Sequence, residues 1–138
     1  MNGVFDMSIE DIIDEAIMEV GRKYGAICAF KYISQAGAVK KLQIGFLFRE
    51  KEENEKFHKI FSEISERLRE FNLEIEVIIL NKAPLATAYI IIRDGTEIYC
   101  DDIEQTRRFK SRLIEKYLDF REEVQGYIQV SFEKARGS

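Results

Sequence analysis

The residues that could do chemistry in this chain lie in two separate stretches. Ser34 opens a run of small residues, up to Ala38, between two apolar segments. A backbone of small residues can approach a phosphate closely. Glu74 and Glu76 stand two residues apart in a later apolar segment, which would put both carboxylates on one face of a strand. Such a pair could bind a divalent cation, although the solvated face of a strand often looks the same.

Carboxylates are missing from the first stretch. No Asp or Glu occurs between Glu19 and Glu50, although the whole chain has 25 acidic and 21 basic residues and a net charge of −4. The charged residues of that interval are all basic: Arg22, Lys23, Lys31, Lys40, Lys41 and Arg49. They form either the solvated edge of two strands or a patch that faces an anion.

Other chemistries find little support. A single histidine, His58, excludes a multi-histidine metal site and leaves general-base chemistry open but unsupported by any other residue pattern. Ser34 has no G-x-S-x-G context, and the chain contains no P-loop or dinucleotide-binding fingerprint. Cys28 and Cys100 lie in apolar runs without metal or redox spacing, so we expect reduced core thiols, and the sequence does not decide whether they pair.

Length and composition predict one domain. A chain of 138 residues with 46% hydrophobic and 33% charged residues is typical of a soluble globular protein. We expect a single domain over 1–138 with its core at about 8–132, in the cytoplasm, with no membrane segment. The high Lys and Glu content favours a thermophilic source. The net charge argues against general attraction to nucleic acid or anionic membranes.

Periodicity and turn residues predict a first helix from a cap at Ser8 to Gly21 or Gly25, followed by strands at 25–33 and 42–48 around a turn at 34–38. A second helix is predicted from 50 to Asn72, and a strand at 74–80. The last helix is predicted to run from a cap at Asp101 or Asp102 to about Phe132. The strand at 74–80 turns fully apolar, as central strands do.

Two of the predicted helices have an apolar side. In the helix from 50 we expect Phe57, Ile60, Phe61, Ile64, Leu68 and Phe71 to be buried. In the last helix the apolar side comprises Ile103, Leu113, Ile114, Tyr117, Leu118, Val124, Tyr127 and Ile128, with room for a bend near Asp119 and Phe120.

The segment from 81 to 100 has two interpretations. Local propensity favours a hairpin that turns at Asp94 and Gly95. Alternatively, Asn81 caps a short helix with Pro84 in its first turn and Gly95 just past its end.

The order of these elements, together with three motifs, resembles the minimal nucleotidyltransferases (MNT proteins) of the DNA polymerase β superfamily, which are often paired with HEPN-domain proteins. The motifs are Glu76–Pro84 with its Leu-Asn-x-Ala-Pro ending, Asp94–Tyr99, and Tyr117–Phe120. The resemblance covers nearly the whole chain and is strongest in the C-terminal half. It implies an α+β nucleotidyltransferase fold, with a small mixed sheet packed with helices and a long C-terminal helix. It also favours a helix from about Pro84 to Ile92.

The family's active site is present only in outline. Its Gly-Ser pair corresponds to Ile33-Ser34, and its Asp-x-Asp becomes Gln43-Ile44-Gly45. Only the third carboxylate remains, as Glu76. The resemblance therefore implies a vestigial pocket of Ser34, Gln43, Gly45 and Glu76, with no catalytic residue, no metal ligand beyond Glu76, and Ser34 as the one weak contact to a cofactor. Two Mg²⁺ ions could not be held on a triphosphate without the missing pair.

The resemblance then implies a catalytically degenerate protein, a pseudoenzyme that acts by protein binding. We expect an antitoxin-like partner of a HEPN-domain ribonuclease in a toxin–antitoxin pair, with no cofactor, and with nucleic acid reached only through the partner. A homodimer follows from family analogy alone. One alternative is an active nucleotidyltransferase that transfers AMP with Mg²⁺ and ATP, using Glu74, Glu76 and another acid such as Asp101. A second is a non-catalytic nucleotide- or RNA-binding module that uses Ser34 and the basic interval.

Overall fold

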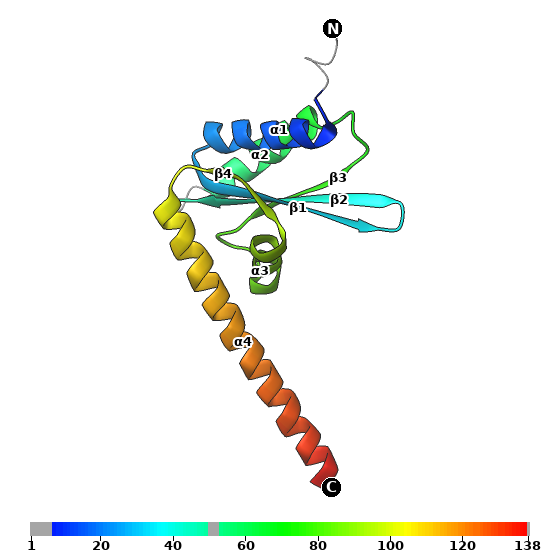
Figure 1. Cartoon of the computed structure of the whole chain (residues 1–138), viewed down its shortest axis with the longest axis vertical. Helices are drawn as coiled ribbons and strands as arrows, with labels where there is room; N and C mark the ends of the chain where they lie inside the picture. The colour runs from blue at the N-terminus through cyan, green and yellow to red at the C-terminus, as the bar shows by residue number, and fades with distance from the viewer. Residues whose placement is uncertain (1–6, 50–52, 138) are drawn as a thin grey trace.

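The computed structural model describes residues 7–49 and 53–137. Its elements are α1 (Ile9–Lys23), β1 (Ala26–Ala36), β2 (Val39–Phe48), α2 (Glu53–Arg67), β3 (Glu74–Ile79), α3 (Leu85–Asp94), β4 (Thr96–Cys100) and α4 (Ile103–Gly137). The four strands form one mixed sheet in the order β3-β2-β1-β4. Helices α1 and α2 cover one face, and α3 with the start of α4 covers the other (Figure 1). The predicted α+β architecture, a small mixed sheet packed with helices and a long C-terminal helix, is confirmed.

Helix α1 begins and ends where the sequence indicates. The Ser8 hydroxyl accepts a hydrogen bond from the Asp11 amide at 3.1 Å, which satisfies one of the free amides of the first turn. The helix stops at Lys23, and Gly25 follows with a φ of 72°, a left-handed conformation that favours glycine.

The first two strands are longer than predicted. Strand pairing continues through Ser34↔Lys41 to Ala36↔Val39, so most of the expected turn at 34–38 belongs to β1. Gly37, with a φ of 66°, allows β1 and β2 to join through a tight hairpin. The small residues therefore do not form a phosphate-binding loop, because the backbone amides of Ser34 and Gln35 lie within an extended strand.

Strand β3 is an edge strand, which corrects the expectation of a central position. It pairs in parallel with β2 on one side only. Its apolar character comes from the helices above and below the sheet. Val77 is buried in the core beneath α1 and α2, and Ile78 is buried on the opposite face, near α3. Burial between two helical layers gives the same continuous apolar run as burial between neighbouring strands.

Helix α2 ends at Arg67, five residues before the predicted stop at Asn72, and its predicted start at 50–52 lies outside the described residues. Ile60, Ile64 and Leu68 are buried as expected. Phe57 and Phe71 are partly buried against the same core, whereas Phe61 is 40% exposed, contrary to the prediction.

Helix α3 confirms the helical interpretation of residues 84–92 and overrides the local β propensity. Its N-cap is Pro84, so Asn81 does not cap it. The Asn81 side chain instead binds the end of β2: its amide donates to the Phe48 carbonyl at 2.7 Å, and its oxygen accepts from the Phe48 amide at 2.9 Å. The Leu-Asn-x-Ala-Pro motif thus fixes the connection from β3 to the adjacent strand.

Helix α4 is a single helix of 35 residues, without a break at Asp119 and Phe120. The Asp102 carboxylate caps it by accepting from the Gln105 amide at 3.1 Å. Leu113 is buried, and Tyr117 stacks on Tyr89 of α3 with ring centroids 3.7 Å apart.

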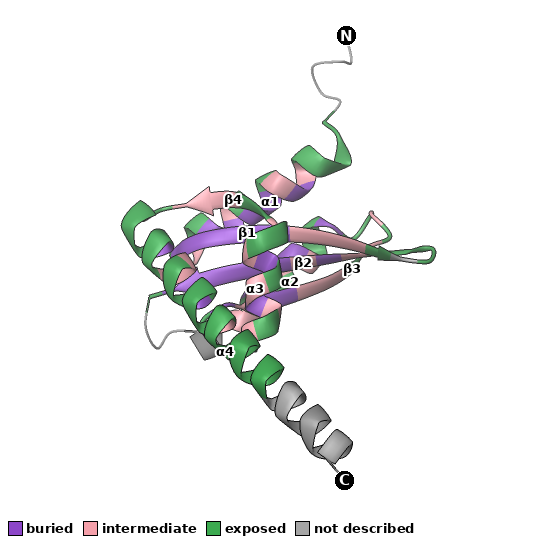
Figure 2. Cartoon of the chain, turned by 60° about the horizontal axis from the view of Figure 1, so that its bottom comes forward, coloured by how far each residue is buried: buried purple, intermediate pink, exposed green. Residues whose placement is uncertain are grey.

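Beyond this contact, α4 extends away from the sheet and is exposed from residue 118 to 126 (Figures 1 and 2). Several positions of its predicted apolar side are therefore exposed, namely Ile103, Ile114, Leu118 and Val124. The side chains of Tyr127 and Ile128 lie outside the described part. No helix among the described residues is long and apolar enough to cross a membrane.

Candidate functional site

The strand register places all four predicted pocket residues on one face of the sheet. Gln43 pairs with Tyr32 of β1 and with Glu76 of β3. Ser34 pairs with Lys41, one step closer to the hairpin on the same face. Leu42 and Ile44 point into the core under α1 and α2, so their neighbours Lys41 and Gln43 face the side of α3.

Glu76 is the centre of this group. Gln43 Nε2 donates a hydrogen bond to Glu76 Oε1 at 2.8 Å, and Lys41 Nζ lies 3.2 Å from the same oxygen. The hydrogen bond from Gln43 lowers the pKa of the Glu76 carboxyl, partial burial opposes this, and the Lys41 ammonium adds to the lowering. Glu76 is thus an ionised carboxylate already bound by an amide and an ammonium.

Gly45 lies on the same face, two residues farther from the hairpin than Gln43, and it is buried in the core under α3. A Cβ at this position would meet Leu80 Cδ2 at 3.0 Å and Ile91 Cγ2 at 3.2 Å. A larger side chain therefore has no room at Gly45. The β2 residues that lie next to Glu76 are Lys41 and Gln43. They are two residues apart, as the two acids of an Asp-x-Asp motif are, but neither is an acid.

The residues around Glu76 do not fit a divalent cation. Mg²⁺ is usually held by carboxylates and phosphates, and here the Glu76 carboxylate is bound to the Lys41 ammonium and to the Gln43 amide group that donates to it. Over the part of the chain that the structure describes, no group of three or more His, Cys, Asp and Glu residues could hold a metal ion.

Asp101 does not join Glu74 and Glu76 in the rearranged acidic site of the alternative interpretation. Glu74 pairs with Lys41 on the same face as Glu76. Asp101, in contrast, donates its amide to the Ile27 carbonyl at 2.8 Å, at the other end of β1. Ile27 and Tyr32, the β1 residue level with Gln43 and Glu76, are five positions apart, or roughly 17 Å along a strand.

The basic interval does not form one anion-facing patch. Lys23 bonds to Glu63, and Lys31 is buried and bonds to Asp14 at 2.6 Å and to Glu10 at 2.9 Å. Lys41 pairs with Glu76, and Arg49 pairs with Asp101 at 3.1 Å. Acids from distant segments therefore neutralise four of the six basic side chains.

The histidine and the cysteines add no reactive centre. His58 is exposed on α2 and contacts the Phe57 ring at a centroid distance of 5.4 Å. Cys28 and Cys100 are opposite each other on β1 and β4, and both thiols are free. Burial raises the pKa of the Cys28 thiol to about 11, which keeps it protonated and unreactive.

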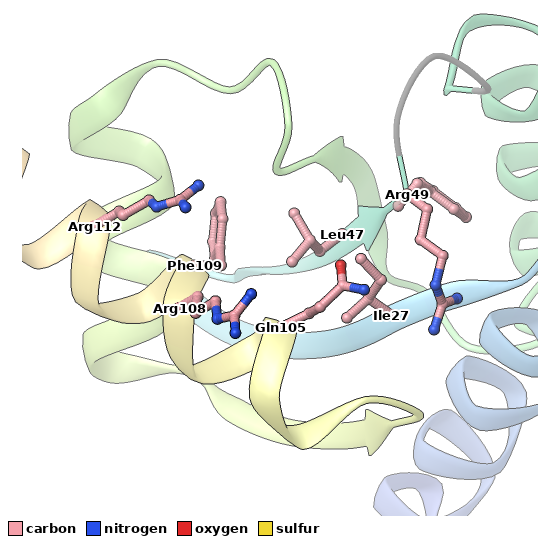
Figure 3. A pocket seen from close by; sticks show the side chains of 8 residues that line it. Ile27, Leu47, Arg49, Gln105, Arg108, Phe109 and Arg112 are labelled. Carbon is pink, nitrogen blue, oxygen red and sulfur yellow. The ribbon is translucent and has the colours of Figure 1, made fainter.

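Sequence reasoning missed a second site at the opposite end of β1 and β2. Here Arg108 and Arg112 of α4 and Arg49 after β2 surround an apolar pocket (Figure 3). The available signal was the spacing of four between Arg108 and Arg112, which places both on one side of a helix. The position of that helix over the sheet was not predictable from the spacing.

Comparisons with known proteins identify the fold. No family profile matches the sequence, and no curated protein matches it. A mutant of the toxin–antitoxin MntA-HpeT matches with a TM-score of 0.69 and 14% identity, covering 84% of this chain and 95% of that chain. The complex of a tri-AMPylated Shewanella oneidensis HEPN toxin with its MNT antitoxin gives a TM-score of 0.66 at 13% identity, over 88% of this chain and 97% of that chain. The toxin–antitoxin MntA-HepT gives 0.64 at 14% identity, over 86% and 95%.

These matches show a shared fold. The chain has the nucleotidyltransferase fold of the MNT antitoxins, as the sequence motifs imply.

Proposed function

We propose that this protein is an antitoxin-like partner of a HEPN-domain toxin and that it acts by binding without nucleotidyl transfer. The observation that supports the partner is the fold. Solved structures that match this chain over 84–88% of its length are toxin–antitoxin complexes, one of them explicitly of a HEPN toxin with an MNT antitoxin.

The group around Glu76 supports action without catalysis. Nucleotidyl transfer in this fold needs carboxylates that hold two metal ions on the triphosphate. In this chain the positions around Glu76 are Lys41 and Gln43, and both donate to it. Binding a cation at Glu76 would require breaking both contacts and placing the metal beside the Lys41 ammonium.

The exposed part of α4 supplies a surface for the toxin. Leu113 and Tyr117 are four residues apart and pack on the α3 side of the helix. Phe120 and Val124 continue the same line past the end of that contact and are 50% and 38% exposed. Ile114 and Leu118, also exposed, flank this line. Contiguous exposed apolar side chains mark protein-binding surfaces, so we assign this stripe to the HEPN partner.

A binding experiment tests the partner and the surface together. The protein is mixed with a HEPN-domain protein encoded next to it, and the dissociation constant is measured by calorimetry. Replacing Phe120 and Val124 with alanine should weaken binding at least about tenfold, or 1.4 kcal/mol. Glu115→Ala, exposed on the other side of α4, is the control and should change affinity by less than about twofold. Equal effects of the two variants would refute the assigned surface, and absence of any complex would refute the partner.

A transfer experiment tests the absence of catalysis. The complex is incubated with labelled ATP and Mg²⁺ or Mn²⁺, and the toxin is examined for covalent label. We expect none. Label on the toxin that disappears in Glu76→Ala would establish the active-enzyme alternative.

A further inference from the structure

A pocket opens between the first turns of α4 and the ends of β1 and β2 that lie away from the hairpin (Figure 3). Its floor is apolar and includes Ile27, Leu47 and the ring of Phe109. Its polar rim consists of Gln105, Arg108 and Arg112 on α4 and of Arg49 on the sheet side. No acidic side chain of residues 7–49 or 53–137 lines it.

Two of the three arginines form no ion pair within the described part of the chain. On α4, Arg107 pairs with Glu104 at 3.6 Å and Lys110 pairs with Glu97 at 3.0 Å. Arg108 and Arg112 form no ion pair with any residue that the structure describes. The two guanidinium groups are four positions apart on one face of the helix, an arrangement that destabilises a helix by a few tenths of a kcal/mol. A bound anion would offset this repulsion.

We propose that this pocket binds the phosphate of a nucleotide, with Arg108 and Arg112 as its principal ligands. The planar guanidinium groups suit the paired oxygens of a phosphate. Arg49 lines the pocket from the sheet side, but its guanidinium is bound to Asp101 at 3.1 Å, so it is not counted among the phosphate ligands.

The half-buried Phe109 ring supplies the second element of recognition. It stands between Arg108 and Arg112 in the pocket lining (Figure 3). Any of the nucleic-acid bases can stack on an aromatic side chain, and each stacked base contributes about 1–3 kcal/mol to the free energy of binding. The pocket is open to solvent, so the phosphate can belong to a free mononucleotide or to one residue of an RNA strand.

This site is independent of the proposed partner and of the group around Glu76. It uses the first turns of α4, whereas the stripe assigned to the toxin begins at Ile114. Tyr32, the β1 residue level with Glu76, lies roughly 17 Å along the strand from Ile27 in the pocket floor.

Titration calorimetry of the full chain with AMP, ATP, a ten-nucleotide RNA and inorganic phosphate tests the proposal. We expect saturable binding of at least one nucleotide ligand. Replacing Arg108 and Arg112 together with glutamine should reduce its affinity at least about tenfold. Phe109→Leu should weaken the nucleotide and leave inorganic phosphate unchanged.

The matched control is Arg107→Gln, one position away on the same helix but paired with Glu104. It should retain affinity within about twofold. Saturable binding of AMP or ATP would identify the ligand as a free mononucleotide, whereas saturable binding of RNA alone would identify it as an RNA strand. Either result supports the site. Three results overturn the proposal: no saturable binding of any ligand, an equal loss in Arg107→Gln, or binding that is lost in Ser34→Ala but kept in the double arginine variant.

Discussion

Replacing Gly45 with alanine tests whether β2 is packed against α3 as tightly as the structure indicates. A Cβ at Gly45 would lie 3.0 Å from Leu80 Cδ2, 3.1 Å from Leu80 Cγ and 3.2 Å from Ile91 Cγ2. Leu80 is 3% exposed and Ile91 is fully buried, so neither side chain has free space into which it can move.

Two effects of opposite sign set the magnitude. Alanine in a strand gains roughly 0.5–1 kcal/mol over glycine, because the unfolded chain loses conformational freedom. Adding a methyl group to a well-packed core typically costs 1–3 kcal/mol. We therefore expect Gly45→Ala to lower the free energy of unfolding by about 1 kcal/mol. Gly45→Asp should prevent stable folding, since it also buries a carboxylate without a partner.

Urea denaturation followed by circular dichroism at pH 7 measures the effect. The matched control is Gly126→Ala on α4, where a Cβ meets nothing within 4 Å. In a helix this exchange should stabilise by up to about 1 kcal/mol. An unfolding midpoint for Gly45→Ala equal to or above that of the wild type would refute the tight contact. It would also reopen Gly45 as the position of a lost metal ligand.

Three further predictions concern the charged and thiol groups. The hydrogen bond from Gln43 lowers the pKa of Glu76, so Glu76 contributes stability that is present above about pH 4.5 and is lost as the pH falls. In Gln43→Ala, the pKa of the Glu76 carboxyl, followed by NMR, should rise toward its ordinary value. An unchanged pKa would contradict the hydrogen bond. Burial lowers the pKa of Lys31, but the hydrogen bonds to Asp14 and Glu10 outweigh it and the net shift is upward, so its stabilisation should persist below about pH 10.5 and fade above it. Urea midpoints at pH 9 and 11.5 should therefore fall less in Lys31→Met than in the wild type, and equal falls would exclude the ion pair as the cause. Cys28, with a pKa of about 11 from burial, should resist a thiol reagent at pH 8 until the protein is unfolded, and rapid modification in the native state would contradict its burial.

Local signals predicted the ends of α1 and the cap of α4 because short-range hydrogen bonds determine them. Ser8 and Asp102 cap the helices that follow them. The helix at 85–94 required the resemblance to the MNT proteins, because its β-branched residues favour a strand in isolation. Burial against the sheet overrides that preference, which amounts to a few tenths of a kcal/mol per residue.

Long-range placement was the part that the sequence did not reveal. The hairpin is longer than predicted because pairing of β1 with β2 extends to Ala36 and Val39, and no local signal distinguished those residues from a loop. Phe61 fits the helical periodicity but faces solvent, because the sheet contacts a narrower side of α2 than the stripe covers. The pocket on α4 combines residues from both halves of the chain, so neither half alone indicates it.

The two ends of β1 and β2 differ in how their positive charges are compensated, and this difference decides where an anion should bind. Near the hairpin, Lys41 is bound to Glu76, and a phosphate arriving there would have to displace a carboxylate. At the other end, Arg108 and Arg112 have no acidic partner among the described residues. A phosphate at this end forms charge-assisted hydrogen bonds without breaking any ion pair of these two arginines. The proposed nucleotide site at α4 therefore does not depend on the group beside Glu76, and the comparison of Ser34→Ala with the double arginine variant separates the two positions.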